Sequence, residues 1–433
     1  MTSPVASTPQ VPAVAAAGPF SAADASLAET VRGEASTVIA FLHRYTGDFD
    51  IAEEAVQDAV VTALRTWREH GIPDRPGAWL TVAAKRRAID LLRHRGRHLQ
   101  AVETLAAQWP TEPEPTRHGD ERVDMLFGCC HPSLAAEARL ALTLRAVVGL
   151  TTAQIAQSFL VPEATLAQRI VRAKRKIVSA GIPLRIPEPH LLADRLDDVL
   201  TVVYLTFNAG FLEPPTAGPT AGPTAGPIAG PPDLSLASDA VWLANLVAAR
   251  LPDEPEAWGL LALLTLQQSR AAARFDATGG LVLLADQDRS RWDHPDIARA
   301  EGYLEQAAVW RRPGRFQLQA AIAACHASAP TWASTDWLQI LTLYDLLHRV
   351  DTSPVVALNR AVALAEYSGA HDGLAAVEPL GDRLAGYYLF HATRADLLRR
   401  LGRTDEALQA NAQALALAAN PVEQNLLRAR LTR

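Results

Sequence analysis

Two short segments of the sequence carry side chains that could bind a metal ion or transfer protons. The first is Cys129-Cys130-His131, whose thiol and imidazole groups are ligand types that suit zinc. A structural zinc site needs four ligands, usually from two paired motifs, and the sequence offers no second pair. We therefore expect the two cysteines to lie in a buried turn, and we predict no metal site.

The second segment contains acids and a histidine that could hold calcium or do acid–base work: Asp286, Asp288, Asp293 and His294. Arg291 occupies the place where an EF-hand loop needs glycine, and arginines alternate with the acids, which favours an ion-paired helix junction. No Walker A, GxGxxG, GxSxG or HExxH motif occurs. The sequence thus predicts no catalytic residues, no cofactor and no enzyme. An enzyme that uses Asp286, Asp288 and His294 remains an alternative hypothesis.

A third group of side chains is suited to nucleic acid, and it requires a helix to position it. Over residues 162–178 a narrow apolar stripe recurs at helical spacing, formed by Leu166, Ile170, Ala173 and Ile177. The opposite side carries Gln168, Val171, Arg172 and Arg175. A buried stripe would hold such a helix while its other face offers guanidinium groups to phosphates and to base edges in the major groove.

A shorter helix is predicted just before this one. Thr151-Thr-Ala-Gln154 is typical of a capping box, and Val161-Pro162 then breaks the pattern. Two short helices with a tight turn between them, the second amphipathic and cationic, predict a helix-turn-helix. A solvated basic helix in a bundle is the alternative interpretation.

Upstream, charge is sorted into an acidic and a basic segment. Residues 79–97 carry six Lys or Arg and one acid, Asp90, which we expect to pair with Arg86 or Arg93. The segment from Asp48 to Asp58 carries five acids and no base, so it would repel DNA and suit a basic protein surface. A solvated, charged helix end is the alternative for the basic segment.

Composition limits the class of protein. The chain has 433 residues, 49% of them hydrophobic and only 6% aromatic, with long Ala- and Leu-rich stretches that favour an all-α fold. The net charge of −6 excludes a uniformly basic surface, though not local basic patches. Three cysteines, no long apolar run and no basic residue before Arg32 lead us to expect a cytoplasmic protein that does not bind a membrane.

Proline, glycine and charge divide the chain into a series of predicted parts. We expect a disordered tail (1–24), a helical module (25–100), a linker (101–120), a second helical module (121–182) and a helical C-terminal region (187–433). The last region contains a Thr-Ala-Gly-Pro repeat at 213–232, which predicts a flexible loop. Segments near Asn359 and Gly369 recur 34 and 33 residues later, at Thr393 and Gly402, a period typical of tetratricopeptide helix pairs. An ordinary helical bundle is the alternative.

Taken together, these segments resemble the extracytoplasmic-function group of the sigma-70 family. Asp50–Asp58 is similar to region 2.1–2.2 of that group, Trp79–Arg93 to region 2.3–2.4, and Ala138–Ile177 to region 4. The resemblance covers about residues 25–180. Four further runs, at 129–132, 159–165, 204–210 and 286–293, resemble a subgroup with a tetratricopeptide-like C-terminal extension. Leu160, Pro162 and Ala167 depart from the usual pattern of the turn and of the base-reading helix.

The resemblance implies a sigma factor with no active site of its own, which directs core RNA polymerase to promoters. Its implied contacts with the β′ clamp helices are Asp50, Glu53, Glu54, Gln57 and Asp58. Its implied contacts with the −10 element are Lys85, Arg86, Arg87, Arg93, Arg95 and Arg97. Its implied contacts with the −35 element are Thr165, Gln168, Arg169, Arg172, Lys174 and Arg175.

Further implied partners are the β flap of the polymerase and a regulatory protein at the C-terminal region. The main alternative is a one-component helix-turn-helix regulator in which the C-terminal solenoid senses a ligand or a partner. That hypothesis leaves the acidic segment 48–58 and the first basic segment without a role.

Overall fold

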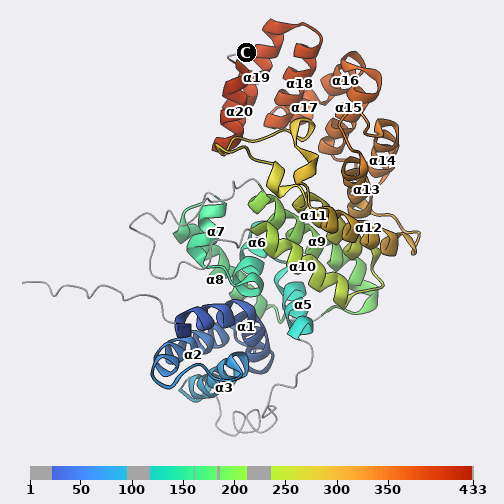
Figure 1. The fold of residues 1–433 in the computed structure, drawn as a ribbon. Coiled ribbons are helices and arrows are strands. Elements are labelled where there is room, and N and C mark those ends of the chain that lie inside the picture. Colours follow the sequence, from blue (N-terminus) through green and yellow to red (C-terminus); the bar gives the residue numbers. More distant parts are fainter. Residues whose placement is uncertain (1–21, 95–117, 160, 183–185, 212–235, 432–433) are drawn as a thin grey trace, which may run out of the picture. The chain divides into compact units, whose positions relative to one another are not determined.

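The computed structural model describes residues 22–94, 118–159, 161–182, 186–211 and 236–431 (Figure 1). Regular structure in these ranges is helical, apart from one isolated antiparallel bridge between Phe275 and Leu281, so the predicted all-α class is confirmed. The predicted loop at 213–232 lies outside the described residues, as do residues 1–21 of the predicted tail and most of the predicted linker. None of the described helices is long and apolar enough to cross a lipid bilayer.

The described residues form two compact units, one of residues 22–94 and one that begins at residue 118. The first unit has three helices: α1 (Ala22–Thr46), α2 (Phe49–His70) and α3 (Pro76–His94). Asp48 caps α2, since its Oδ1 atom accepts hydrogen bonds from the backbone N–H groups of Asp50 (3.0 Å) and Ile51 (3.3 Å). Gly47 ends α1 with a φ of +63°, a backbone conformation that glycine adopts without strain.

Small side chains bring the three helices of the first unit close together. The inner face of α2 is formed by Ile51, Ala52, Ala55, Val56 and Ala59, all buried. They pack against buried residues of α3 and α1, chiefly Leu80, Ala84, Ala88, Val38 and Leu42. In the first half of α2, the outer face is left to polar and acidic side chains.

The second unit starts with four short helices: α5 (His118–Cys129), α6 (Ala136–Thr143), α7 (Thr152–Ser158) and α8 (Glu163–Ser179). A π-helical turn at Leu144–Val148 follows α6, and Gly149 ends it in the left-handed conformation. The chain continues into α9 (Pro189–Phe211), α10 (Leu236–Arg250) and α11 (Pro255–Gln268). An irregular stretch then carries three single 3₁₀ turns at Ala271–Ala273, Leu284–Asp286 and Arg289–Arg291.

The remaining helices stack on their neighbours in chain order. They are α12 (His294–Ala308), α13 (Arg315–Ser328), α14 (Trp337–Val350), α15 (Pro354–Ser368), α16 (Ala370–Val377), α17 (Gly381–Leu384), α18 (Tyr388–Arg400), α19 (Thr404–Leu417) and α20 (Pro421–Leu431), with a 3₁₀ turn at Glu378–Leu380 (Figure 1). The 33-residue echo has a structural basis. Gly369 joins α15 to α16 and Gly402 joins α18 to α19, each with positive φ (+105° and +74°). This repetition of helix, glycine turn and helix is the arrangement expected of a helix-pair solenoid.

A buried histidine makes the first unit sensitive to acid. His43 lies against Phe49, with ring centroids 4.2 Å apart, and its Nε2 atom has no hydrogen-bond partner. Burial lowers the pKa of His43 to about 4, against the opposing pull of Asp48. Between pH 6.5 and 4 the unfolded chain binds a proton that the folded unit does not, so stability falls as the pH falls.

We predict that lowering the pH from 7 to 5 destabilises the first unit by about 2 kcal/mol through this group alone. The measurement is the opening free energy of amides in residues 38–56 of the full chain, from hydrogen exchange corrected for intrinsic rates. His43→Leu should flatten the pH dependence, whereas the matched change at the exposed His70, His70→Leu, should leave it in place. An equally steep pH dependence in His43→Leu would contradict this assignment.

Candidate nucleic-acid interface

The predicted capping box is present at the start of α7. The backbone N–H of Thr151 donates to Oε1 of Gln154 (2.9 Å), and the backbone N–H of Gln154 donates to Oγ1 of Thr151 (3.2 Å). Two amide donors at the helix N-terminus are thus satisfied reciprocally. The start of this short helix is fixed by local sequence.

Helix α8 is buried on one side only. The predicted apolar stripe is confirmed, because Leu166, Ile170, Ala173 and Ile177 are each at most 5% exposed. The stripe packs against α6 and α7. Four of the residues predicted to contact DNA, Thr165, Gln168, Arg172 and Arg175, are exposed on the outer side. The helix therefore presents a polar and cationic surface on a rigid base.

Two of the exposed side chains, Gln168 and Arg172, are hydrogen-bonded to one another. Nη2 of Arg172 donates to Oε1 of Gln168 (3.2 Å), one helical turn earlier. The bond orients both planar groups and leaves the amide N–H groups of Gln168 and most of the guanidinium donors available. These are the groups that bind adenine and guanine edges in the major groove. Exposed Val171 lies beside them and offers an apolar surface of the kind that contacts a thymine methyl group.

The remaining two predicted contacts on α8 are placed less favourably. Arg169 is half-buried, and Lys174 is buried, with 9% of its surface exposed. Lys174 follows Ala173 on the inner side of the helix, and its charge acts on the buried thiol of Cys129. The prediction that Lys174 contacts phosphate is therefore corrected, because the fold turns this side chain toward the interior.

The cysteine pair lies in a buried turn, as predicted. Cys129 and Cys130 are both fully buried, and Sγ of Cys130 lies 3.5 Å from Oγ1 of Thr143. Burial raises the pKa of Cys130 to about 12, and it raises that of Cys129 as well. Both thiols are therefore protonated at neutral pH, and a thiol must lose its proton to bind a metal. In the ranges given above, no group of three or more His, Cys, Asp or Glu side chains is arranged to hold a metal ion.

In the first unit, the predicted acidic surface follows one side of α2. Asp50 and Gln57 are exposed, and Glu53, Glu54 and Asp58 are partly exposed, at spacings that keep all five opposite the buried face. Helix α3 carries the predicted basic residues, of which Arg86 and Arg93 are exposed and Lys85 and Arg87 are partly exposed. Arg95 and Arg97 lie outside the described residues.

Ion pairs link the acidic and basic residues of this unit. Nε of Arg87 donates to Oδ2 of Asp58 on α2, and this bond raises the pKa of Arg87. Two residues that the sequence analysis assigned to different partners are thus brought together. The expected pairing of Asp90 is confirmed with Arg93, at 3.7 Å. Trp79 packs its ring edge-on against Trp67, 5.7 Å between centroids, and so belongs to the core of the unit.

The acidic segment near residue 290 is a helix junction, but caps rather than ion pairs stabilise it. Oδ1 of Asp288 accepts hydrogen bonds from the backbone N–H (3.0 Å) and the hydroxyl (2.6 Å) of Ser290. Oδ1 of Asp293 accepts from the backbone N–H of Asp296 (2.9 Å) at the start of α12. Arg289, which was expected to pair with these acids, instead donates to the carbonyl oxygens of His326 and Ala329.

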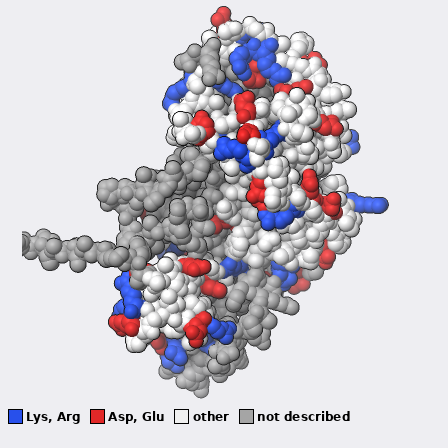
Figure 2. All heavy atoms as spheres, viewed as in Figure 1, with Lys and Arg blue, Asp and Glu red and all other residues white. Residues whose placement is uncertain are grey.

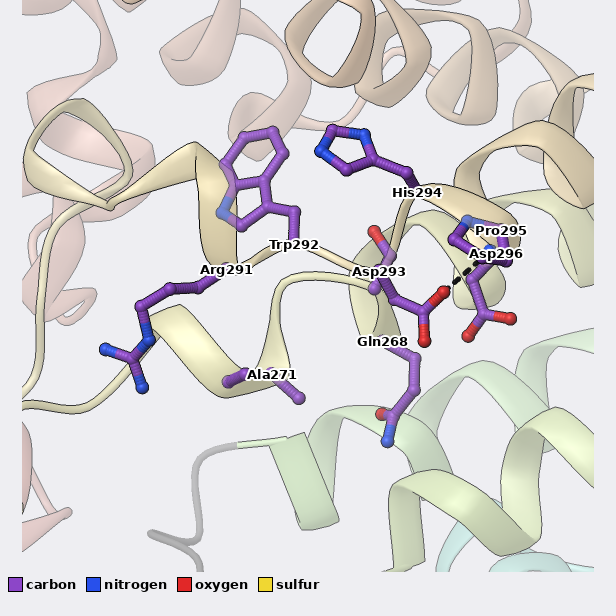
Figure 3. A pocket seen from close by; sticks show the side chains of 10 residues that line it. Gln268, Ala271, Arg291, Trp292, Asp293, His294, Pro295 and Asp296 are labelled. Carbon is purple, nitrogen blue, oxygen red and sulfur yellow. Dashed lines mark hydrogen bonds between the residues drawn. The ribbon is translucent and has the colours of Figure 1, made fainter.

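An open depression of about 560 Å³ lies beside this junction (Figure 3). Asp293, His294 and Asp296 line it on one side, and Arg291 extends on the other (Figure 3). Asp286 and Asp288 are not among its lining residues. The depression therefore does not gather the three residues on which the hypothesis of a C-terminal enzyme depends.

The surface of the C-terminal helices shows no field of a single sign from the side drawn in Figure 2. Acidic and basic groups are interspersed there, with wide uncharged areas between them (Figure 2). Long-range attraction of a charged polymer needs a one-signed surface.

The helices that support α8 are bound to the C-terminal helices. Arg139 of α6 forms an ion pair with Asp198 of α9, and both side chains are largely shielded from solvent. Three more contacts join α5 to later residues: Arg195 Nη2 to Phe127 O (2.5 Å), Ile186 N–H to Asp124 Oδ1 (2.9 Å), and the Arg122 guanidinium over the Trp242 ring (4.9 Å). Residues 118–182 and the helices after them thus share one packed unit.

Three family models match successive parts of the chain. Residues 30–98 match a family model described as sigma-70 region 2, and residues 124–177 match one described as sigma-70, region 4. Residues 195–308 match a family of unknown function (DUF6596).

A relative from Rhizobium meliloti (strain 1021), described as an uncharacterized protein, is 42% identical over 398 residues. The match covers 90% of this chain and 91% of the relative, so the C-terminal helices are common to both proteins. No solved structure matches the chain.

The exposed pair on α8 generates a direct prediction. Gln168→Ala and Arg172→Ala should each remove about 1–3 kcal/mol of discrimination at one base pair, because each side chain offers donors to a base edge. The measurement is selection of bound duplexes from a randomised library by the full chain, followed by affinity at several salt concentrations.

Arg291→Ala is the matched control, since it removes the same charge from an exposed site of the same unit. It should leave the selected sequences unchanged. Selection of the same sequences by wild type, Gln168→Ala and Arg172→Ala would contradict the assignment of α8 as the reading helix.

Proposed function

The chain belongs to the sigma-70 family and is a sigma factor with regions 2 and 4, and from this premise we propose that it is of the extracytoplasmic-function type. In this proposal the chain brings core RNA polymerase to a specific set of promoters and starts transcription there. The polymerase supplies all of the chemistry, and the chain supplies recognition. Because both DNA and polymerase reside in the bacterial cytoplasm, we expect the protein to act in that compartment.

The one-sided burial of α8 is the observation that carries the proposal. A helix whose apolar stripe is fully buried and whose outer face offers Gln168, Arg172 and Arg175 is suited to enter a major groove. We assign base reading at the −35 element to Gln168 and Arg172, and phosphate contacts to Thr165, Arg169 and Arg175. Val171 is added as a contact for a thymine methyl group.

We further propose that α3 contacts the −10 element through Lys85, Arg86 and Arg93. Their exposure on one helix supports this role. Arg87 is the weakest of the proposed contacts, because Asp58 already satisfies much of its charge. The proposal extends to Arg95 and Arg97 on sequence grounds alone.

The acidic side of α2 is the proposed polymerase contact. Asp50, Glu53, Glu54 and Gln57 form a polar surface that complements a basic protein helix and disfavours DNA. We assign this surface to the clamp helices of the β′ subunit, and region 4 to the β flap. Asp58 stands at the edge of the surface, where it pairs with Arg87.

The C-terminal helices are proposed to modulate promoter use through region 4. Because α5 and α6 pack on α9 and α10, a regulatory protein bound to the C-terminal helices can act on the support of α8. Deletion of residues 187–433 would also uncover Arg139 and Arg122, so a loss of output in such a fragment would mix two causes. Point substitutions at this contact separate them.

Run-off transcription with purified core polymerase and the full chain tests the proposal. A sigma factor yields specific transcripts that the core alone does not make. The alternative of a one-component regulator predicts that the chain binds DNA but neither copurifies with the core nor starts transcription with it.

We predict that Asp50→Lys combined with Glu53→Lys weakens binding to core polymerase by about tenfold or more, since it replaces attraction by repulsion at the proposed contact. The measurement is the dissociation constant of the complex, together with the yield of run-off transcript. The matched control is Glu69→Lys combined with Asp74→Lys, which makes the same charge change at exposed positions after the acidic surface. Equal weakening in both double variants would contradict a localised contact.

A second prediction concerns the ion pair between α6 and α9. Arg139→Asp places two acids together in a shielded contact, so it should cost about 1–3 kcal/mol of stability in the second unit and lower transcript yield. Adding Asp198→Arg should restore most of both quantities. Urea unfolding and run-off transcription of the four proteins in the cycle provide the measurement. If Arg139→Asp combined with Asp198→Arg restores stability but the transcript yield stays low, a role of this ion pair in promoter use is excluded.

A further inference from the structure

Three arginines of the second unit lie close together, Arg274 buried and Arg270 and Arg289 half-buried. Arg270 directly follows α11, Arg274 follows the turn at Ala271–Ala273, and Arg289 opens the turn at Arg289–Arg291. The two turns pack on one another. His326, near the end of α13, lies within electrostatic reach of Arg270 and Arg289. None of these residues has a role in the function proposed above.

The arginines bind neutral groups. Nη1 of Arg274 donates to the carbonyl oxygen of Phe211, and its guanidinium stacks on the Phe211 ring at 3.2 Å from the centroid. Arg270 donates to the side-chain oxygen of Gln267, and its guanidinium lies 5.9 Å from the same Phe211 ring. Carbonyl oxygens and aromatic faces carry only partial negative charge, so they do not neutralise these cations.

Arg289 is bound in the same way, on the other side of the cluster. Its Nη1 atom donates to the carbonyl oxygen of His326 (2.6 Å), and its guanidinium lies 4.9 Å from the centroid of the Trp292 ring. Throughout the described part of the chain, no carboxylate forms an ion pair with Arg270, Arg274 or Arg289. Glu423 acts on Arg274 electrostatically, but its Oε1 atom accepts the hydroxyl of Tyr388.

Burial and mutual repulsion both act on the charges of this cluster. Burial, followed by the neighbouring guanidinium, lowers the pKa of Arg270 to about 10 and that of Arg274 to about 9. Burial and the same two neighbours, Arg270 and Arg289, lower the pKa of His326 to about 4. The imidazole is therefore neutral at physiological pH, and the three guanidinium groups keep a charge of about +3 there.

Buried polar atoms around Arg289 also lack partners. Nη2 of Arg289, Nε1 of Trp292 and Nδ1 of His326 are buried and make no hydrogen bond. Arg289 Nη2 and Trp292 Nε1 are donors, and buried donors without an acceptor are rare in folded proteins, so each one calls for a ligand, an ion or a water molecule. Here they accompany an excess of positive charge, which favours an acceptor that is negative.

We infer that the cluster of Arg270, Arg274, Arg289 and Trp292 binds a small anion with a phosphate group. Guanidinium groups match the oxygens of phosphate with paired N–H donors, and a phosphate carries enough charge to balance more than one of them. A single carboxylate balances only one. Because Arg274 and Trp292 are buried and Arg270 and Arg289 are half-buried, the proposed ligand is a small molecule and not a nucleic acid or a protein surface.

The depression of Figure 3 brings solvent to the edge of the cluster. Its lining includes Ser269 and Ala271, which flank Arg270 in the chain, and Trp292 (Figure 3). The depression itself is lined by Asp293 and Asp296 as well, which disfavour an anion there. We therefore place the proposed anion on the arginine side of the segment, against Arg270, Arg274 and Arg289.

Titration of the full chain with inorganic phosphate tests this inference. Isothermal calorimetry at constant ionic strength, with chloride as the exchanged ion, should show saturable binding at one site. Binding should raise the unfolding temperature, because the ligand binds only the folded state. Arg289→Gln should weaken phosphate binding by about tenfold or more, since it removes a charged pair of donors. The absence of saturable binding to the wild type would overturn the inference.

Arg291→Gln is the matched control, two residues away and exposed. It should bind phosphate as the wild type does, and equal affinities of Arg289→Gln and wild type would overturn the inference. Trp292→Phe is the second variant in case Arg289→Gln does not fold. It keeps an aromatic ring for packing but removes the Nε1 donor, so it should weaken binding severalfold while circular dichroism stays unchanged.

Two further ligands distinguish the sources of the phosphate group. Tighter binding of glycerol 3-phosphate than of inorganic phosphate supports a phosphorylated metabolite as the ligand, and the reverse order supports free phosphate. Acetate at the same concentration should not compete. Acetate that competes as strongly as phosphate would overturn the choice of a phosphate group.

Discussion

The structure depends on the burial of one narrow stripe on α8. Leu166, Ile170 and Ile177 are held against the helices before them, and this contact alone decides which side of α8 faces outward. A shift of one residue along the helix would turn Gln168 and Arg172 by about 100° toward the interior. The apolar residues, which never touch a base in the proposed complex, therefore determine which polar residues can.

The two functional surfaces of the first unit are coupled. The ion pair between Asp58 and Arg87 joins the acidic side of α2 to the basic helix α3, and the charges of Glu54 and Asp90 act on the same guanidinium. A basic protein that draws Asp58 away would release Arg87. On the proposed function, occupation of the acidic surface would increase the positive charge that α3 offers to DNA once polymerase is bound.

Local patterns in the sequence predicted the features that depend on neighbouring residues. The capping box at Thr151, the stripe on α8 and the glycine turn at Gly402 all follow from spacings of a few residues. The sequence did not predict contacts between distant segments, such as Arg87 with Asp58 or Arg139 with Asp198, 29 and 59 residues apart. The predicted phosphate contact of Lys174 was misplaced for a related reason. Helical spacing places it near the edge of the buried side, and only the packing of α5 and α6 decides whether such a residue lies inside or outside.

The predicted ion pairs of Arg289 were wrong because alternating charge in a sequence resembles ion pairing, whereas the acids there cap helices.

The continuity of the second unit from His118 onward has a geometric consequence for promoter choice. Residues 95–117 connect the last described residue of α3 to the first of α5. A polypeptide of this length can span at most about 80 Å. That reach equals a little more than two turns of B-form DNA. On the proposed function, this tether length sets an upper limit on the spacer between the two promoter elements that a single molecule can bridge.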